Sequence, residues 1–168
     1  MKFRLRYFAT NDFADYQVLM NNEKLARLAG MQVLKTELEQ WLAFKGMVGS
    51  PNFLAIVNEE NRLSGGIFIF QQAEEALFEL GYLLAEEYWN QGIMSRAVHF
   101  ALKSLRNRQS ATGGTVKVQA NVLTDNQASQ RVLEKNGFIR QPGVFENVSG
   151  YDGRARKEYL YELNLKLA

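Results

Sequence analysis

The residue types that could do chemistry are concentrated between Phe78 and Arg108. A strand expected at 76–84 is followed by the turn Asn90-Gln91-Gly92 and then by a long amphipathic helix. A helix that starts at such a turn presents several backbone N–H groups without intrahelical partners, and its dipole attracts anions to the same place. We interpret the turn as the site that holds the pyrophosphate of a cofactor, and the preceding strand as the part that carries the chemistry.

The composition excludes several kinds of chemistry. The 168 residues are 46% hydrophobic and 23% charged, which is ordinary for one globular domain over 1–168, and the net charge of +2 does not favour nucleic acid as a partner. Without cysteine the chain has no disulfide, thiolate metal site or cysteine nucleophile, and its one histidine, His99, argues against a histidine-built metal site. We therefore expect no metal. Since neither a signal-like segment nor a long apolar run is present, we expect a cytoplasmic protein with no membrane partner.

The other predicted elements must position this stretch. Alternation of apolar and polar residues predicts strands at 2–7, 52–57, 63–70, 76–84, 115–121, 138–141 and 156–165. Residues 142–153 are expected to be irregular. The order of strands and helices predicts a mixed sheet with helices on both faces.

Helices are predicted where a capping residue precedes a helical apolar period. The expected helices run from Thr10 or Asn11 to about 22, over 23–28, from 36 to 45, from 92 to about 108, and from 124 to 136. The third and fifth open with capping boxes at Thr36 and Thr124. The third is expected to bury Leu38, Trp41 and Leu42. Gly137 is expected to end the fifth in the left-handed conformation.

Two segments together resemble a known family. ELGYLLAEEYWNQGIMSRAV and, later, NVLTDNQASQRVLEKNGF resemble the GNAT acetyltransferase superfamily, most closely the Rim-type branch that acetylates N-terminal amines of ribosomal proteins and has relatives with other acceptors. The likeness extends from FRLRYFATNDFADY to RKEYLYELNL. It implies an α/β (α+β) domain with a mixed, mostly antiparallel central sheet, splayed at the cofactor site. It also implies acetyl-CoA as the donor co-substrate.

The resemblance indicates where acetyl-CoA would bind. The pantetheine would lie along the strand that ends at Leu83-Leu84, the pyrophosphate at 90–95, and Asn126 would contact the pantetheine. The superfamily pattern Gln/Arg-x-x-Gly-x-Gly/Ala is met by residues 89–94, which keep only the middle glycine, so the side chains of Trp89 and Met94 must point away from the phosphates. The expected cofactor-binding residues are Leu83, Leu84, Trp89, Asn90, Gln91, Gly92, Ile93, Met94, Ser95, Asn121, Asn126 and Ser129.

Acetyl transfer to an amine requires a base for the ammonium and assistance to the departing thiolate. In Rim-type relatives a glutamate directly before Leu-Gly-Tyr serves as base, and Glu79 matches it. The alternative is that Glu79 is a rim residue or pairs with an arginine. Ser129 matches a serine of these relatives and is the candidate donor to the thiolate, with a backbone-bonding role as the alternative. Many GNAT enzymes use a tyrosine four residues later, where this chain has Leu133.

The leading hypothesis is an N-acetyltransferase in which a primary amine of a peptide or small molecule attacks directly, because no covalent nucleophile stands at a suitable place. The alternative is a CoA-binding sensor or interaction module without turnover. Tyr82, Tyr88 and Trp89 are interpreted as packing residues and not as acids, with a role for Tyr88 or Trp89 in shaping the acceptor entrance as the alternative. Neither the acceptor nor the oligomeric state follows from the sequence, and a homodimer stays open.

Overall fold

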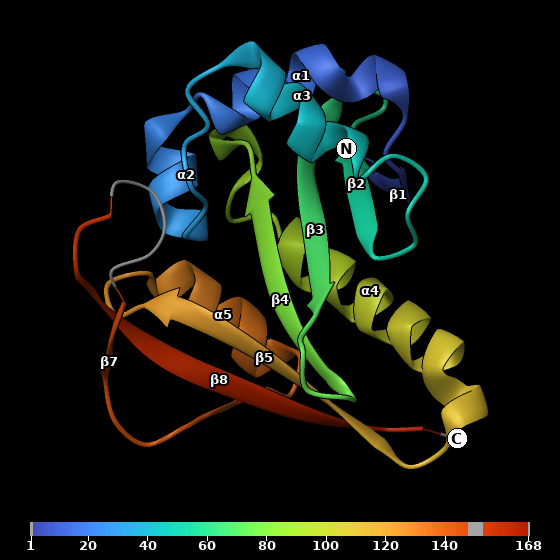
Figure 1. Ribbon diagram of the computed structural model, residues 1–168, viewed down its shortest axis with the longest axis vertical. Helices are drawn as coiled ribbons and strands as arrows, with labels where there is room; N and C mark the ends of the chain where they lie inside the picture. The colour runs from blue at the N-terminus through green and yellow to red at the C-terminus, as the bar shows by residue number, and fades with distance from the viewer. Residues whose placement is uncertain (1, 148–152, 168) are drawn as a thin grey trace.

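The computed structural model describes residues 2–147 and 153–167 (Figure 1). Its strands are β1 (Arg4–Tyr7), β2 (Phe53–Val57), β3 (Leu63–Gln71), β4 (Leu77–Leu84), β5 (Thr115–Leu123), β6 (Ile139–Arg140), β7 (Phe145–Asn147) and β8 (Arg156–Lys166). Its α-helices are α1 (Phe13–Met20), α2 (Glu23–Ala29), α3 (Glu37–Lys45), α4 (Ile93–Gln109) and α5 (Gln127–Lys135). Short 3₁₀ turns occupy Thr10–Asp12, Glu86–Tyr88 and Ser110–Thr112.

The strands form one sheet in the order β1-β2-β3-β4-β5-β8-β6, and β7 pairs with β8. Every pairing is antiparallel except that of β4 with β5, which is parallel. Parallel neighbours need a crossover connection, and α4 provides it. The mixed, mostly antiparallel sheet predicted above is confirmed.

β4 and β5 separate soon after they meet. Leu77, Phe78 and Glu79 pair with residues 117–119, and no later residue of β4 pairs with β5. Figure 1 shows the two strands diverging from this point toward α2 and α5. The sheet is therefore open along a V-shaped gap whose apex lies at Glu79.

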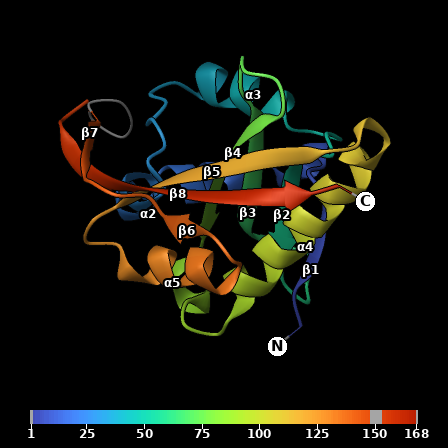
Figure 2. The same cartoon turned by 90° about the horizontal axis from the view of Figure 1, so that it is seen from below.

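Helices cover both faces of the sheet, so that it lies between two apolar layers (Figure 2). Helices α1, α2 and α3 enclose one core with the sheet, which includes Phe8, Tyr16, Leu25, Phe44, Phe68 and Leu83. Helices α4 and α5 enclose the other, which includes Phe78, Leu80, Met94, Val98, Leu105, Leu133 and Tyr161. The long amphipathic helix predicted after Gly92 is confirmed as α4, and its apolar period is buried at Ile93, Met94, Ala97, Val98, Ala101, Leu102 and Leu105. Within the described ranges, no helix has the length and apolar character needed to cross a bilayer.

Two predicted helix starts are wrong. α5 begins after Asn126, whose side chain accepts a hydrogen bond from Ser129 N, and not at Thr124. Thr124 N–H still donates to the carbonyl of Lys157 on β8, which holds the chain in the sheet until the helix begins. At the other start, neither Thr10 nor Asn11 caps α1, because residues 10–12 form a 3₁₀ turn. The predicted Thr36 capping box and the left-handed Gly137 are confirmed.

The predicted buried face of α3 is wrong at both leucines, whereas Trp41 is half-buried against the core. Leu38 and Leu42 are 65% and 60% exposed, and the helix buries Gln40 and Phe44 instead. Phe44 packs against the rings of Phe8, Phe13, Tyr16 and Trp41. This aromatic cluster fixes the rotation of α3, so the leucine stripe faces solvent.

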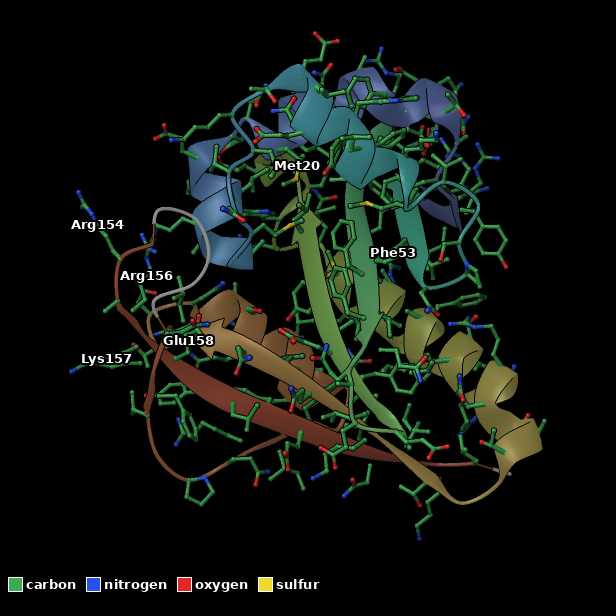
Figure 3. The ribbon with its side chains drawn as sticks, viewed as in Figure 1. Met20, Phe53, Arg154, Arg156, Lys157 and Glu158 are labelled. Atoms are coloured by element: carbon green, nitrogen blue, oxygen red, sulfur yellow. The ribbon has the colours of Figure 1, made fainter. Side chains whose placement is uncertain are left out.

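The segment expected to be irregular contains a strand. β7 pairs with the start of β8, where Phe145 lies opposite Glu158. Glu158 is buried and accepts a hydrogen bond from Asn147 Nδ2 at 3.2 Å. Figure 3 shows Arg156, Lys157 and Glu158 at this end of β8. Three residues are too few for an alternating pattern to be recognised in the sequence, which is why β7 was not predicted.

Candidate active site

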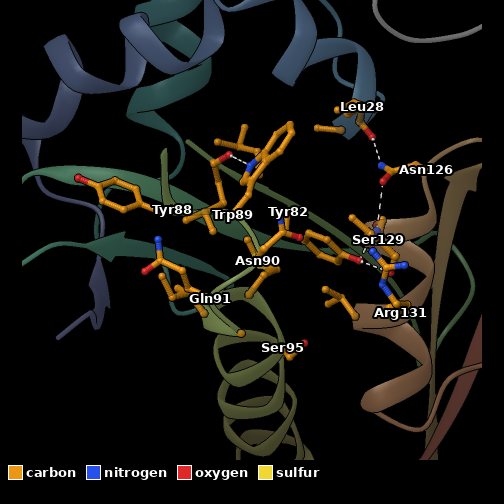
Figure 4. Close-up of a pocket in the computed structure, with 18 of the residues that line it drawn as sticks. Leu28, Tyr82, Tyr88, Trp89, Asn90, Gln91, Ser95, Asn126, Ser129 and Arg131 are labelled. Carbon is orange, nitrogen blue, oxygen red and sulfur yellow. Dashed lines mark hydrogen bonds between the residues drawn. The ribbon is translucent and has the colours of Figure 1, made fainter. Parts of the chain in front are cut away.

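A cavity of about 310 Å³ occupies the gap between β4 and α5, beside the start of α4 (Figure 4). Its walls come from α2, β4, the 86–92 turn, α4 and α5. It is lined by Leu25, Leu28, Ala29, Tyr82, Leu83, Leu84, Tyr88, Trp89, Asn90, Gln91, Gly92, Ile93, Met94, Ser95, Asn126, Ala128, Ser129, Arg131, Val132 and Lys135. The structure thus brings together every predicted cofactor-binding residue except Asn121.

The start of α4 forms one end of the cavity and presents unpaired backbone N–H donors there. Gly92 precedes the helix in the left-handed conformation, at φ 70° and ψ 8°, and Asn90 is also left-handed at φ 59°. No side chain caps the helix, so the first N–H groups, on Ile93, Met94 and Ser95, have neither intrahelical nor side-chain acceptors. Together with the helix dipole, these donors form a binding site for an anionic group.

The charged side chains that line the cavity are both basic. Arg131 and Lys135 on α5 line it, and none of the twenty lining residues is acidic. The two cations lie one helical turn apart and therefore share a face of α5. Neither residue was predicted as part of the site, because basic residues on an amphipathic helix look like an ordinary solvated face until the neighbouring wall is known.

Trp89 turns its indole back onto β4. Its Nε1 donates to the carbonyl of Leu84 at 2.7 Å, and the Lys24 ammonium lies 4.9 Å from the ring centroid. Met94 is buried in the core beneath α4. Since the Met94 side chain points into the core and the indole is held against the end of β4, their bulk leaves the donors at the start of α4 accessible.

The backbone of β4 offers a second set of polar groups to the gap. Ala85 N–H donates to Ser64 O on β3, whereas Ala76 O accepts from Lys117 N–H on β5. Because backbone groups alternate between the two neighbours of a strand, those of Tyr82 and Leu84 face the β5 side, where the strands have separated. The Leu84 carbonyl already accepts from Trp89 Nε1, so Leu84 offers its N–H to this edge. An extended ligand with amide groups, such as a pantetheine, fits this edge as an added strand would.

The first turn of α5 brings two hydroxyl groups together at the other wall. Ser129 Oγ lies 2.7 Å from the phenolic oxygen of Tyr82 (Figure 4). Asn126 holds this turn in place, since its Oδ1 accepts from Ser129 N at 3.1 Å and its Nδ2 donates to Leu28 O at 3.4 Å. Leu133 is fully buried and does not line the cavity. Ser129 therefore bonds the side chain of Tyr82 through its hydroxyl.

Glu79 and Asn121 lie outside the cavity. Glu79 is half-buried at the apex of the gap, where it pairs with Gln119 of β5. It makes no ion pair with any residue in the described ranges, so the arginine partner considered above is absent there. Asn121 is exposed on β5, opposite Leu160. Both side chains point to the α1–α3 face, the face of Leu83 and Gln119.

A larger hollow of about 760 Å³ lies between β1 and α4, lined by residues such as Phe3, Leu5, Arg96 and Phe100. It meets neither the gap in the sheet nor Ser129. The smaller cavity is therefore the better candidate, because there the N–H donors, the open strand edge and the hydroxyl pair converge.

Comparison with known proteins identifies the family and the fold. Residues 2–139 match the family model described as an acetyltransferase (GNAT) domain. A search of curated proteins gave no match. The fold is similar to a GNAT-family acetyltransferase from Bacillus anthracis, at 22% identity and a TM-score of 0.79 over 97% of this chain and 95% of that one.

Two further structures share the fold. The spermidine N-acetyltransferase from Vibrio cholerae, solved with CoA and spermine, is 14% identical with a TM-score of 0.79 over 96% of this chain and 95% of that one. The acetyltransferase from Salmonella typhimurium that modifies the N-terminal serine of ribosomal protein L7/L12 is 19% identical with a TM-score of 0.72 over 99% and 96%. With the family model covering most of its length, the chain belongs to the GNAT family of acetyltransferases.

Proposed function

We propose that this acetyltransferase moves the acetyl group of acetyl-CoA to a primary amine by direct attack. The observation that carries the proposal is the three-pair contact of β4 with β5, beyond which the sheet opens beside the uncapped start of α4. Phosphates would bind the N–H groups of Ile93, Met94 and Ser95. The pantetheine would follow Tyr82 and Leu84, and the thioester would lie beside Ser129.

The amine would approach from the α1–α3 face, where the Glu79 carboxylate lies at the apex of the gap. Glu79, directly or through a water, takes one proton from the ammonium, and the nitrogen lone pair attacks the thioester carbonyl carbon. When the tetrahedral intermediate collapses, the C–S bond breaks and sulfur leaves with the electron pair. The nitrogen loses its second proton to solvent and the thiolate gains one, which gives the amide and free CoA.

The similar structures support an amine as the acceptor. One similar protein is named as a spermidine N-acetyltransferase and another as the enzyme that modifies the N-terminal serine of a ribosomal protein, and both acceptors carry amines. The two acceptors differ greatly in size, so the similarity in fold supports the functional group and not one molecule.

The test is an acceptor panel that measures free CoA. The protein is incubated with acetyl-CoA and one amine at a time: peptides starting with serine or alanine, spermidine, and free lysine. We expect CoA release above the amine-free control with at least one class, and mass spectrometry of that amine should find the acetyl group. If acetyl-CoA binds but none of the amines causes release of CoA, the proposed turnover is contradicted and a CoA-binding sensor is favoured.

A further inference from the structure

We propose that Tyr82 is a positioning residue for the leaving-group step, because its phenol directs the hydroxyl hydrogen of Ser129 toward the sulfur of acetyl-CoA. This inference rests on the proposed function and adds a residue to it. Sequence patterns classified Tyr82 as a packing residue. The contacts it makes in the cavity assign it a different role.

The geometry places two acceptor oxygens, both of Ser129, within reach of the phenolic hydrogen of Tyr82. Tyr82 Oη lies 2.7 Å from Ser129 Oγ and 3.2 Å from the backbone carbonyl of Ser129. Both residues line the cavity, one from β4 and the other from the first turn of α5. The shorter distance favours the hydroxyl as the acceptor of the phenolic hydrogen.

The direction of this bond decides what Ser129 can do. If the phenol donates to Ser129 Oγ, the serine keeps its own hydrogen for a second acceptor, and the thioester sulfur is the acceptor that the bound donor would bring. If the phenol donates to the carbonyl, Ser129 must donate to Tyr82 and has no hydrogen left for sulfur. In the first arrangement the phenol also polarises the serine hydroxyl, since consecutive hydrogen bonds strengthen one another.

The ionisation of Tyr82 is consistent with a donor that keeps its proton. Burial raises the pKa of the Tyr82 phenol, and the hydrogen bond with Ser129 opposes this rise only in part. An ordinary thiol has a pKa of about 8.5. Proton transfer from the phenol to the departing thiolate is therefore unfavourable, so the pair stabilises the thiolate by hydrogen bonding and solvent supplies the proton.

Leu133, which stands where many GNAT enzymes carry a tyrosine, supplies no hydroxyl to the cavity. Its side chain is completely buried in the α4–α5 core and has no hydroxyl to offer. Tyr82 is the tyrosine that contacts Ser129, and it does so from the opposite wall of the cavity (Figure 4).

If Tyr82 had only a structural role, it would hold α5 against the sheet. Another tyrosine in the molecule does this and serves as the comparison. The hydroxyl of Tyr161, on β8, donates to Glu134 Oε1 on α5 at 3.0 Å and lies outside the cavity. Tyr161→Phe therefore removes a phenol that anchors the same helix without touching the reacting groups. It is the control for stability.

The first arm of the experiment is a kinetic cycle on Tyr82→Phe, Ser129→Ala and the double variant. Tyr82→Phe should lower kcat about three- to tenfold, the range of one neutral hydrogen bond. The Kd of acetyl-CoA should stay within about twofold, and Tyr161→Phe should keep kcat while its melting temperature falls. In the Ser129→Ala background, Tyr82→Phe should have no further effect on kcat, because Tyr82 acts through the serine.

The second arm needs no turnover. CoA and desulfo-CoA are titrated by calorimetry from about pH 7 to about pH 10, across the ordinary thiol pKa of about 8.5. The affinity of wild type for CoA should increase as the pH rises and the thiol ionises, whereas its affinity for desulfo-CoA should not show this increase. Tyr82→Phe and Ser129→Ala should lose the increase for CoA.

The outcomes separate the two claims. A normal kcat for Tyr82→Phe, or an effect that persists in the Ser129→Ala background, would overturn the positioning role while leaving acetyl transfer intact. Equal pH dependence for wild type and Tyr82→Phe would overturn it as well. Absence of CoA release from wild type with every amine would contradict the proposed function, and the calorimetric arm would still decide whether the tyrosine orients a donor to sulfur.

Discussion

The reacting groups come from opposite sides of the gap between β4 and β5. The Glu79 carboxylate lies at its apex on the α1–α3 face, and the hydroxyls of Ser129 and Tyr82 lie in the cavity. An amine and a thioester entering from these two sides would meet in the gap. In the proposed mechanism, Glu79 would remove the proton from the acceptor, and Ser129 with Tyr82 would stabilise the leaving group.

Glu79→Gln tests the first of these roles, because it removes the carboxylate and keeps the shape. We expect turnover to fall about ten- to a thousandfold, the range of general-base contributions, with little change in the Kd of acetyl-CoA. Wild-type turnover should decrease as the pH falls and the carboxylate takes up a proton. Steady-state kinetics and calorimetry on one preparation give both quantities.

The matched control is Glu162→Gln. Glu162 lies opposite Gln119 on the same sheet face and pairs with Lys117 at 3.6 Å, one strand further from the gap. The Glu162→Gln variant should retain wild-type turnover. Glu79 would be excluded as the base by an unchanged rate in its glutamine variant, or by a loss that appears only in acetyl-CoA affinity.

At the scale of elements, α4 supplies the proposed phosphate site and was also the best predicted. Its long apolar period and the glycine before it specify both the buried face and the start, and the structure agrees at each buried position. The shorter α3 was assigned the wrong face because a leucine pair looked like a buried stripe. Aromatic packing around Phe44, which depends on distant residues, overrode that local pattern.

Gly92→Val tests the start of α4. A left-handed backbone costs a residue with a side chain about 1–2 kcal/mol, so valine should lower stability and distort the turn that holds the N–H donors. The Cβ itself meets no protein atom within 4 Å, so the fold should survive. Acetyl-CoA should raise the melting temperature of wild type by mass action and leave that of the variant unchanged.

Gly49→Val supplies the comparison, since Gly49 has φ 73°, equally open surroundings and no place in the cavity. Gly49→Val should be destabilised to a similar degree as Gly92→Val, and acetyl-CoA should still raise its melting temperature. A full shift in Gly92→Val would mean that the phosphates bind elsewhere.

At the scale of the whole molecule, the sequence determined much of the fold and less of the site. Strand and helix periods predicted a mixed sheet covered on both faces, and the family resemblance added the splay, which no local pattern encodes. Residues next to element boundaries, such as Gly92 and Asn126, were predicted as part of the site. The Tyr82–Ser129 pair and the cations Arg131 and Lys135 were not, because their role depends on how α5 lies across the gap from β4.

The most direct test of the account is amide hydrogen exchange with and without saturating acetyl-CoA. Binding in the gap predicts slower exchange at the backbone N–H groups of Tyr82, Leu84, Ile93, Met94 and Ser95, because they would gain hydrogen bonds to the pantetheine and phosphates. Exchange at β1 should not change. Protection confined to β1 and the adjoining face of α4, where the larger hollow lies, or no protection at the gap, would contradict the central claim that acetyl-CoA binds between the separated strands.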